Sequence, residues 1–139
     1  MSNESEQWDD GFVAVDEAEC KRLLREEGIG ILGTLVEGEI ELRPVNYAVH
    51  RATVVIRTDR GVLFEAARKG QAASLAVVSV DEDARTAWSV IAKGRLEPAD
   101  AQISGVQLFS WAHDGKAERI RLTIESLSGR RLEPRNGGD

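Results

Sequence analysis

The segment Arg43-Pro44-Val45-Asn46-Tyr47 places a guanidinium, an amide and a phenol on or beside one strand that a proline interrupts. Proline lacks an N–H, so it is confined to strand edges and bulges, where neighbouring main-chain groups stay unpaired. Unpaired N–H and C=O groups suit a planar heterocycle with donors and acceptors at its rim. The segment therefore indicates a heterocycle-binding strand, and the alternative is an ordinary bulged edge strand.

A second candidate site lies at the end of the next expected strand, where Arg57 and Thr58 precede a short helix. A guanidinium and a hydroxyl at such a point can hold an anion, because both donate hydrogen bonds to it. Arg68 follows one or two helical turns later and is a further candidate ligand. The alternative interpretation is solvated surface charge.

A third candidate is the pair Trp88-Ser89, inside a segment rich in β-forming residues. A strand tryptophan is usually part of a core, but tryptophan is also enriched at protein interfaces. Trp111 lies in a loop-like stretch, where an exposed indole would suit a partner subunit or a ligand.

Several other chemistries are excluded. The run Gly28-Ile29-Gly30-Ile31-Leu32-Gly33 fits the letters GxGxxG, but a helix precedes it and a strand follows, the reverse of a dinucleotide fingerprint. One cysteine, Cys20, cannot form an internal disulfide or a cysteine-rich zinc site. The two histidines, His50 and His113, are far apart in the sequence and do not suggest a metal site or a hydrolase triad.

These residues must be positioned by a mainly β (α+β) domain. Asp16-x-x-Glu19 has the spacing of a capping box, and it opens a helix that Gly28 ends. The pattern of apolar residues and turn signals then predicts further helices over 62–69 and 98–109, and strands over 29–36, 40–49, 53–58, 72–80, 86–96 and 119–127. Six short strands joined mostly by hairpins indicate an antiparallel barrel, closed or partly closed.

Length and charge limit the function classes. A chain of 139 residues is one domain by size, here 12–132 between an acidic, disordered tail (1–11) and a C-terminal tail (133–139). The net charge of −6 and a pI near 5.0 argue against nucleic-acid binding, which needs clustered basic residues. No run approaches the length of a membrane span, and the acidic start is unlike a secretory signal. The sequence therefore predicts a cytoplasmic protein.

The order of these elements resembles a known family over residues 12–132. The most specific parts are PVNY at 44–47, RT at 57–58, WSV at 88–90 and SGRR at 128–131. Together they are similar to the flavin-binding split-barrel proteins related to pyridoxamine 5′-phosphate oxidase, in particular the small actinobacterial members. The resemblance implies a six-stranded antiparallel split β-barrel with short flanking helices. It also implies a homodimer with two FMN sites across the subunit interface.

The resemblance gives the candidate residues their roles. Val45, Asn46 and Tyr47 would line the isoalloxazine ring, and Arg57 and Thr58 would hold the ribityl chain and phosphate. Trp88 and Ser89 of the partner would close the site. Arg43 and Arg68 remain candidates from the sequence alone. The implied activity is hydride or electron transfer to an unidentified small substrate, in an oxidoreductase that is not a vitamin B6 enzyme.

Two departures from the family pattern bear on the cofactor. Relatives often read GTKL after the RT strand, with the lysine on the phosphate, whereas this chain has Gly61-Val62-Leu63-Phe64; Ala87 also replaces a frequent glycine. The missing lysine predicts weak FMN binding, with Arg68 as a substitute. Two alternatives therefore stay open: a deazaflavin-dependent reductase, or a non-enzymatic binding module that has lost tight FMN binding.

Overall fold

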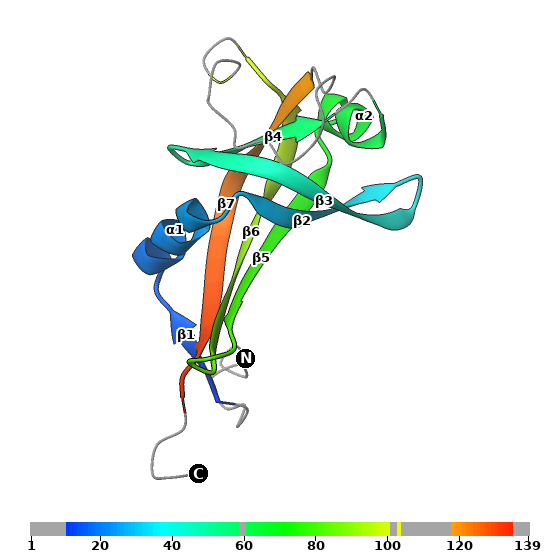
Figure 1. Cartoon of the computed structure of the whole chain (residues 1–139). Helices are drawn as coiled ribbons and strands as arrows, with labels where there is room; N and C mark the ends of the chain where they lie inside the picture. The colour runs from blue at the N-terminus through cyan, green and yellow to red at the C-terminus, as the bar shows by residue number, and fades with distance from the viewer. Residues whose placement is uncertain (1–10, 59–60, 101–102, 104–117, 135–139) are drawn as a thin grey trace.

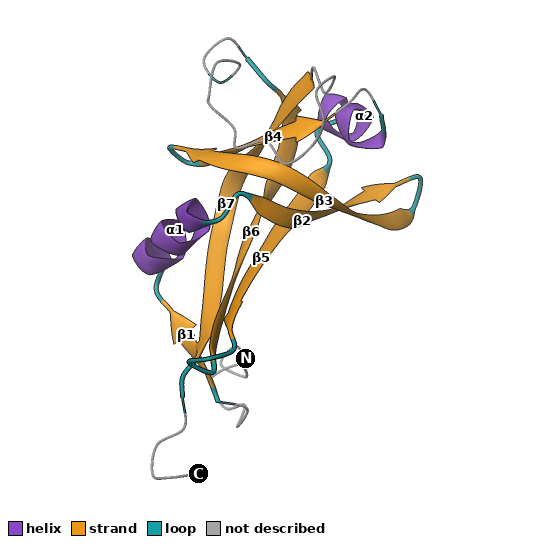
Figure 2. Ribbon diagram, viewed as in Figure 1, coloured by secondary structure: helices purple, strands orange, loops and turns teal. Residues whose placement is uncertain are grey.

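The computed structural model describes residues 11–58, 61–100, 103 and 118–134. Figure 1 shows β5, β6 and β7 as long strands, with the β2–β3 hairpin crossing in front of them. The two helices lie at different ends of the barrel, and strands dominate the fold (Figure 2). The elements are β1 (Phe12–Val15), α1 (Glu17–Glu26), β2 (Ile29–Val36), β3 (Glu39–His50), β4 (Thr53–Thr58), α2 (Val62–Arg68), β5 (Ala72–Asp81), β6 (Thr86–Pro98) and β7 (Glu118–Leu132).

The strands form a ring. Their order is β1-β7-β4-β3-β2-β5-β6, every pairing is antiparallel, and a further pairing of β6 with β7 closes β2 to β7 into a barrel of six strands. The predicted split barrel is confirmed. The predicted number of strands was wrong, because a seventh, β1, is added outside the ring against the end of β7, pairing Phe12 with Leu132. β1 has only four residues, too few to show a periodicity before the helix begins at Asp16.

Strand β7 is longer than its sequence pattern predicts. It continues through Ser128 and Gly129, which were expected to form a turn, because β1 and β6 pair with it on both sides. A bulge between Lys93 and Gly94 adjusts the β6–β7 register. A Cβ on Gly94 would come within 1.8 Å of the Thr123 carbonyl oxygen, so only glycine fits there without movement of the backbone.

Other sequence predictions meet the structure unevenly. The turn at Glu37-Gly38 is confirmed, with φ of 52° and 82°, values typical of a tight type I′ hairpin. Pro98 ends β6 instead of starting a helix, and most of the expected helix 98–109 lies outside the described residues, as do Trp111 and His113. The expected tails also lie outside them, apart from Gly11, Glu133 and Pro134. Neither described helix combines the length and apolar character needed to cross a membrane.

The core fills the ring because alternate residues of each strand point inward. It includes Leu32, Tyr47, Ile56, Leu75, Val90, Leu96, Ile120 and Leu122, all at most 1% exposed. Helix α1 adds Cys20, Leu23 and Leu24 on one face, and α2 adds Leu63, Ala66 and Ala67. The predicted start of α1 is confirmed, since the Glu19 N–H donates to the Asp16 carboxylate over 2.8 Å.

Glu19 also fastens α1 to the barrel. Its carboxylate accepts hydrogen bonds from Arg22 on the same helix (2.6 Å) and from Arg131 on β7 (2.8 Å). These two guanidinium groups, Arg22 first, lower the pKa of Glu19 from its ordinary 4.5 to about 2. The ion pairs therefore join the first helix to the last strand.

We predict a loss of stability in acid that depends on Glu19. Because its pKa is lower in the folded chain, the stabilisation is complete above about pH 4.5 and is lost as the pH falls towards 2. Urea unfolding from pH 6 to pH 2 should show a smaller decline for Glu19→Gln than for the wild type. Glu17→Gln, which changes an exposed carboxylate of the same turn, serves as the control. Parallel declines for wild type and Glu19→Gln would contradict the assignment.

Candidate functional site

Asn46 and Arg57, from two of the predicted segments, lie side by side. They are register partners in the β3–β4 pairing, and Asn46 also pairs with Ile29 of β2. Both side chains point outward, because the residues that flank them along each strand are buried. The structure thus brings an amide and a guanidinium together on the outer surface of the barrel.

The proline of β3 does not interrupt the strand. β3 is continuous from Glu39 to His50, and Pro44 stays in register with Ile31 of β2. The missing N–H is tolerated because residues 39–45 pair with β2 only, whereas β4 pairs with residues 46–50. Within the described residues this half of β3 is an edge, as one of the two alternatives predicted, and its free side begins next to Asn46.

Tyr47 and Val45 face the core. The Tyr47 side chain is 1% exposed, and its hydroxyl donates to the Leu24 carbonyl oxygen at the end of α1 over 2.6 Å. Burial, and then the charge of Glu27, raise the pKa of the phenol above its ordinary value. Val45 is 6% exposed. Of the three residues expected at an isoalloxazine, only Asn46 directs its side chain outward, and the other two offer main-chain groups.

The candidate anion ligands are divided in the same way. Thr58 is 9% exposed and points inward, opposite to Arg57. Arg68 is exposed and pairs with Glu65 of its own helix at 3.2 Å, and Arg43 pairs with Glu41 at 2.6 Å. Arg57 is therefore the one predicted basic ligand that adjoins Asn46.

Trp88 and Ser89 point to opposite faces of β6. Trp88 is half-buried and packs against the core, whereas Ser89 faces outward between its register partners Val78 and Arg130. Strands β2 and β5 separate β6 from β3, so one subunit does not bring Ser89 to Asn46 and Arg57. A pocket of about 350 Å³ across β1, β6 and β7 contains Ser89 and Arg130.

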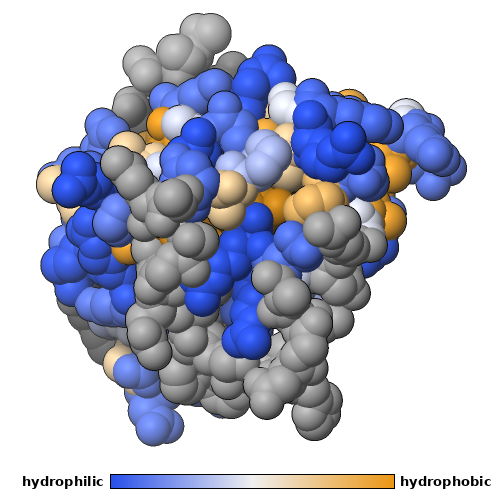
Figure 3. Space-filling view, turned by 90° about the horizontal axis from the view of Figure 1, so that it is seen from above, coloured by the Kyte–Doolittle hydropathy of each residue, from blue (hydrophilic) through white to orange (hydrophobic). Residues whose placement is uncertain are grey.

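The outer face of four neighbouring strands is apolar. Of the nine large hydrophobic side chains that are exposed in the described residues, only Val13 lies elsewhere. The other eight occupy outward positions of β3, β2, β5 and β6: Ile40, Leu42, Ile29, Ile31, Leu35, Val78, Val80 and Ile91. We call these eight the apolar face. Figure 3 shows, from above, apolar side chains gathered between hydrophilic ones.

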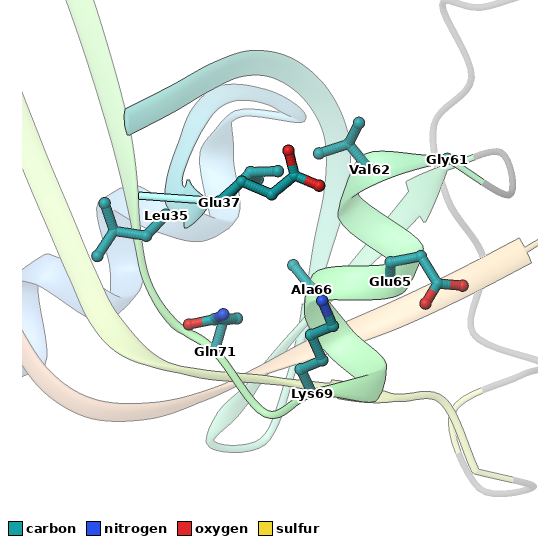
Figure 4. Close-up of a pocket in the computed structure, with 9 residues that line it drawn as sticks. Leu35, Glu37, Gly61, Val62, Glu65, Ala66, Lys69 and Gln71 are labelled. Atoms are coloured by element: carbon teal, nitrogen blue, oxygen red, sulfur yellow. The ribbon is translucent and has the colours of Figure 1, made fainter. Parts of the chain in front are cut away.

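Sequence reasoning missed a pocket of about 400 Å³ beside α2 (Figure 4). It lies between this helix and the β2–β3 turn. Its apolar wall includes Leu35, Val62 and Ala66, and its polar groups include Glu37, Lys69 and Gln71. These residues come from separate segments whose local patterns indicate only a hairpin and a helix, so no single motif could reveal the pocket. No cluster of three potential metal ligands occurs among the residues that the structure describes.

Comparison with known proteins gives the family. The family described as pyridoxamine 5′-phosphate oxidase matches residues 16–131. A search of curated proteins found no match.

Solved structures share the fold. An FAD binding protein from Mycobacterium smegmatis is 22% identical, with a TM-score of 0.66 over 88% of this chain and 99% of that one. An FAD-binding protein from Mesorhizobium loti is 20% identical, with a TM-score of 0.70 over 86% and 97%. A conserved protein of unknown function from Corynebacterium diphtheriae is 21% identical, with a TM-score of 0.69 over 88% and 99%.

We predict that Tyr47→Phe lowers stability. The substitution leaves the buried Leu24 carbonyl without its donor, which should lower the free energy of unfolding by about 1–3 kcal/mol. The phenol titrates above its ordinary pKa, so its stabilisation is lost as the pH rises further. Urea unfolding at neutral pH measures the effect, and Phe64→Leu gives a core substitution without a hydrogen-bond change. Unchanged stability of Tyr47→Phe would contradict this role.

Proposed function

Because the chain belongs to the pyridoxamine 5′-phosphate oxidase family, we propose that it binds a flavin and transfers a hydride or electrons between that flavin and a small substrate. The observation that carries the proposal is the pairing of Asn46 with Arg57 on the outer surface. These two residues belong to the two segments that the sequence marks for a heterocycle and for an anion. Two proteins of the same fold are described as FAD-binding, which supports a flavin as the heterocycle.

The local geometry supports recognition of both ends of a flavin. The Asn46 amide offers a donor and an acceptor, and the free edge of β3 next to it adds main-chain N–H and C=O groups. Arg57 supplies positive charge for the phosphate. Both lie beside the outward Ile29, which provides an apolar surface for a ring. This arrangement orients a flavin with its ring over β3 and β2 and its phosphate towards the end of β4.

A bound flavin would supply the redox chemistry, so the protein needs only to bind and orient it. The Tyr47 hydroxyl is engaged with Leu24 inside the core and does not serve proton transfer to a surface ligand. Ser89 faces outward, and a second subunit could bring it to the flavin.

We also propose a homodimer formed through the apolar face. Antiparallel sheets with one face in water alternate apolar and polar residues, but here outward positions of four strands are apolar as well. Exposed patches of this kind mark interaction sites. A second copy would cover the apolar face and carry its Ser89 and Arg130 towards Asn46 and Arg57 of the first. The cofactor site would then be complete only in the dimer.

One observation favours weak FMN binding, and with it the alternative of a barrel without flavin. Leu63, at the position of the missing lysine, is 4% exposed and packs in the core. A lysine there would have to carry its ammonium out of the core, so Leu63→Lys is not a simple repair. Arg68 is already paired with Glu65. A deazaflavin remains a further alternative for the same site.

The flavin proposal predicts a specific dependence on Arg57. Arg57→Ala should weaken FMN binding roughly ten- to a hundredfold, because it removes a charge-assisted hydrogen bond of about 1.5–3 kcal/mol. Fluorescence titration with FMN and with riboflavin measures this, and riboflavin should be much less affected because it lacks the phosphate. Arg25→Ala, an exposed arginine of α1, is the matched control. Visible spectra after adding FMN, FAD or a deazaflavin identify the cofactor, and no binding of any of them would refute the proposal.

The dimer proposal predicts a mass twice that of the 15.2 kDa chain at micromolar concentration. Ile31→Glu should give a monomer, because it places a charge in the middle of the apolar face. Val13→Glu introduces the same charge at an exposed hydrophobic residue outside that face and should leave the dimer intact. Sedimentation velocity distinguishes the two masses. A wild-type monomer, or dissociation by both variants alike, would contradict the proposed interface.

A further inference from the structure

The pocket beside α2 has two apolar sides that can enclose a flat ring. Leu35 comes from the end of β2, and Val62 and Ala66 come from one side of α2. Figure 4 shows Leu35 on one side of the pocket and the helix on the other. The volume of about 400 Å³ lies within the range of small-molecule sites. The pocket therefore has the size and wall chemistry for a nucleobase with its sugar.

Three polar side chains at this pocket have no partner among the described residues. Glu37 and Lys69 form no ion pair there, and the side chain of Gln71 forms no hydrogen bond. Figure 4 shows the Lys69 ammonium extending past Ala66, with Gln71 nearby and Glu37 above. Glu65, the remaining charged residue of the lining, is paired with Arg68. The pocket thus offers one free carboxylate, one free ammonium and one amide.

The pocket adjoins the expected phosphate site. Gly61 lines the pocket and follows Thr58 by three residues, so the two lie at most about 11 Å apart along the chain. Arg57, the proposed phosphate ligand, immediately precedes Thr58. A group attached beyond the phosphate of the bound flavin would therefore reach the pocket.

We propose that this pocket binds the adenine nucleotide half of a dinucleotide flavin, so that the chain selects FAD over FMN. The inference rests on the proposed flavin function. Leu35 on one side and Val62 and Ala66 on the other contact the faces of the adenine ring. The Glu37 carboxylate accepts from the adenine amino group, and the Gln71 amide pairs with a ring nitrogen. The Lys69 ammonium meets the second phosphate.

This assignment also accounts for the missing lysine. Leu63 contributes to the core and cannot contact a phosphate, which leaves the first phosphate with Arg57. A second phosphate next to Lys69 would recover a charge-assisted contact some distance away. Binding energy from the adenine half would then replace what the first phosphate lacks.

The turn supplies a variant that tests Glu37 without damaging the fold. Glu37 has a φ of 52° and precedes Gly38, positions at which Asn-Gly is the preferred pair of a type I′ turn. Glu37→Asn should therefore fold at least as stably as the wild type while losing the carboxylate. Lys69→Met removes the ammonium and keeps the length of the side chain. Glu39→Asn, the same change two residues along and outside the pocket lining, is the matched control.

The experiment is a titration of the wild type and the three variants with riboflavin, FMN and FAD. We expect the wild type to bind FAD at least about tenfold more tightly than FMN. Glu37→Asn and Lys69→Met should each remove most of that advantage and leave FMN affinity unchanged, whereas Glu39→Asn should change neither. Equal binding of FAD and FMN by the wild type, or equal weakening of both by the variants, would overturn this inference alone. Failure of all three flavins to bind would refute the proposed function and the inference with it.

Discussion

Strand β7 pairs with β4 and β1 along one side and with β6 along the other, so one strand closes the ring and also carries the added seventh strand. Closure leaves each strand with an inner and an outer face, and the interior is filled by side chains. Any ligand site of this barrel must therefore be made from outward side chains, from main-chain groups at a free edge, or from the ends of the ring. This constraint separates Asn46 from Tyr47 and Arg57 from Thr58, although the sequence places each pair together.

Helix α1 is held to the ring at points that also shape the candidate site. Glu19 binds Arg131 of β7, and the Tyr47 hydroxyl binds the Leu24 carbonyl. The second contact ties β3 to the end of α1 next to Asn46. Gly129 brings β7 close to the same helix, because a Cβ there would lie 2.7 Å from the Cys20 sulfur. The phenol and the cysteine thus have packing roles that position β3 and β7.

Much of the fold could be predicted from the sequence because local patterns determine it. Asp16 caps α1, the positive φ values at Glu37 and Gly38 form the expected turn, and β2 and β4 have the predicted bounds. β1 could not be found, since four residues carry no clear periodicity. The motif letters PVNY and RT identify segments but not faces, and faces follow only once the register of the ring is known. The pocket beside α2 depends on Glu37 and Lys69, which are brought together only by tertiary packing.

The outer surface itself changes character at the candidate site. Outward positions of β3, β2, β5 and β6 are largely apolar, whereas β7 presents Arg119 and Arg121 outward next to β4. Asn46 and Arg57 lie at this border, with Ile29 on the apolar side. A flavin has an apolar ring system and a charged tail, so a border of this kind matches both parts in the order in which they are joined. Burial of the apolar side by a second copy would remove water from the ring and leave the charged tail near Arg57, which ties cofactor binding and assembly to one surface.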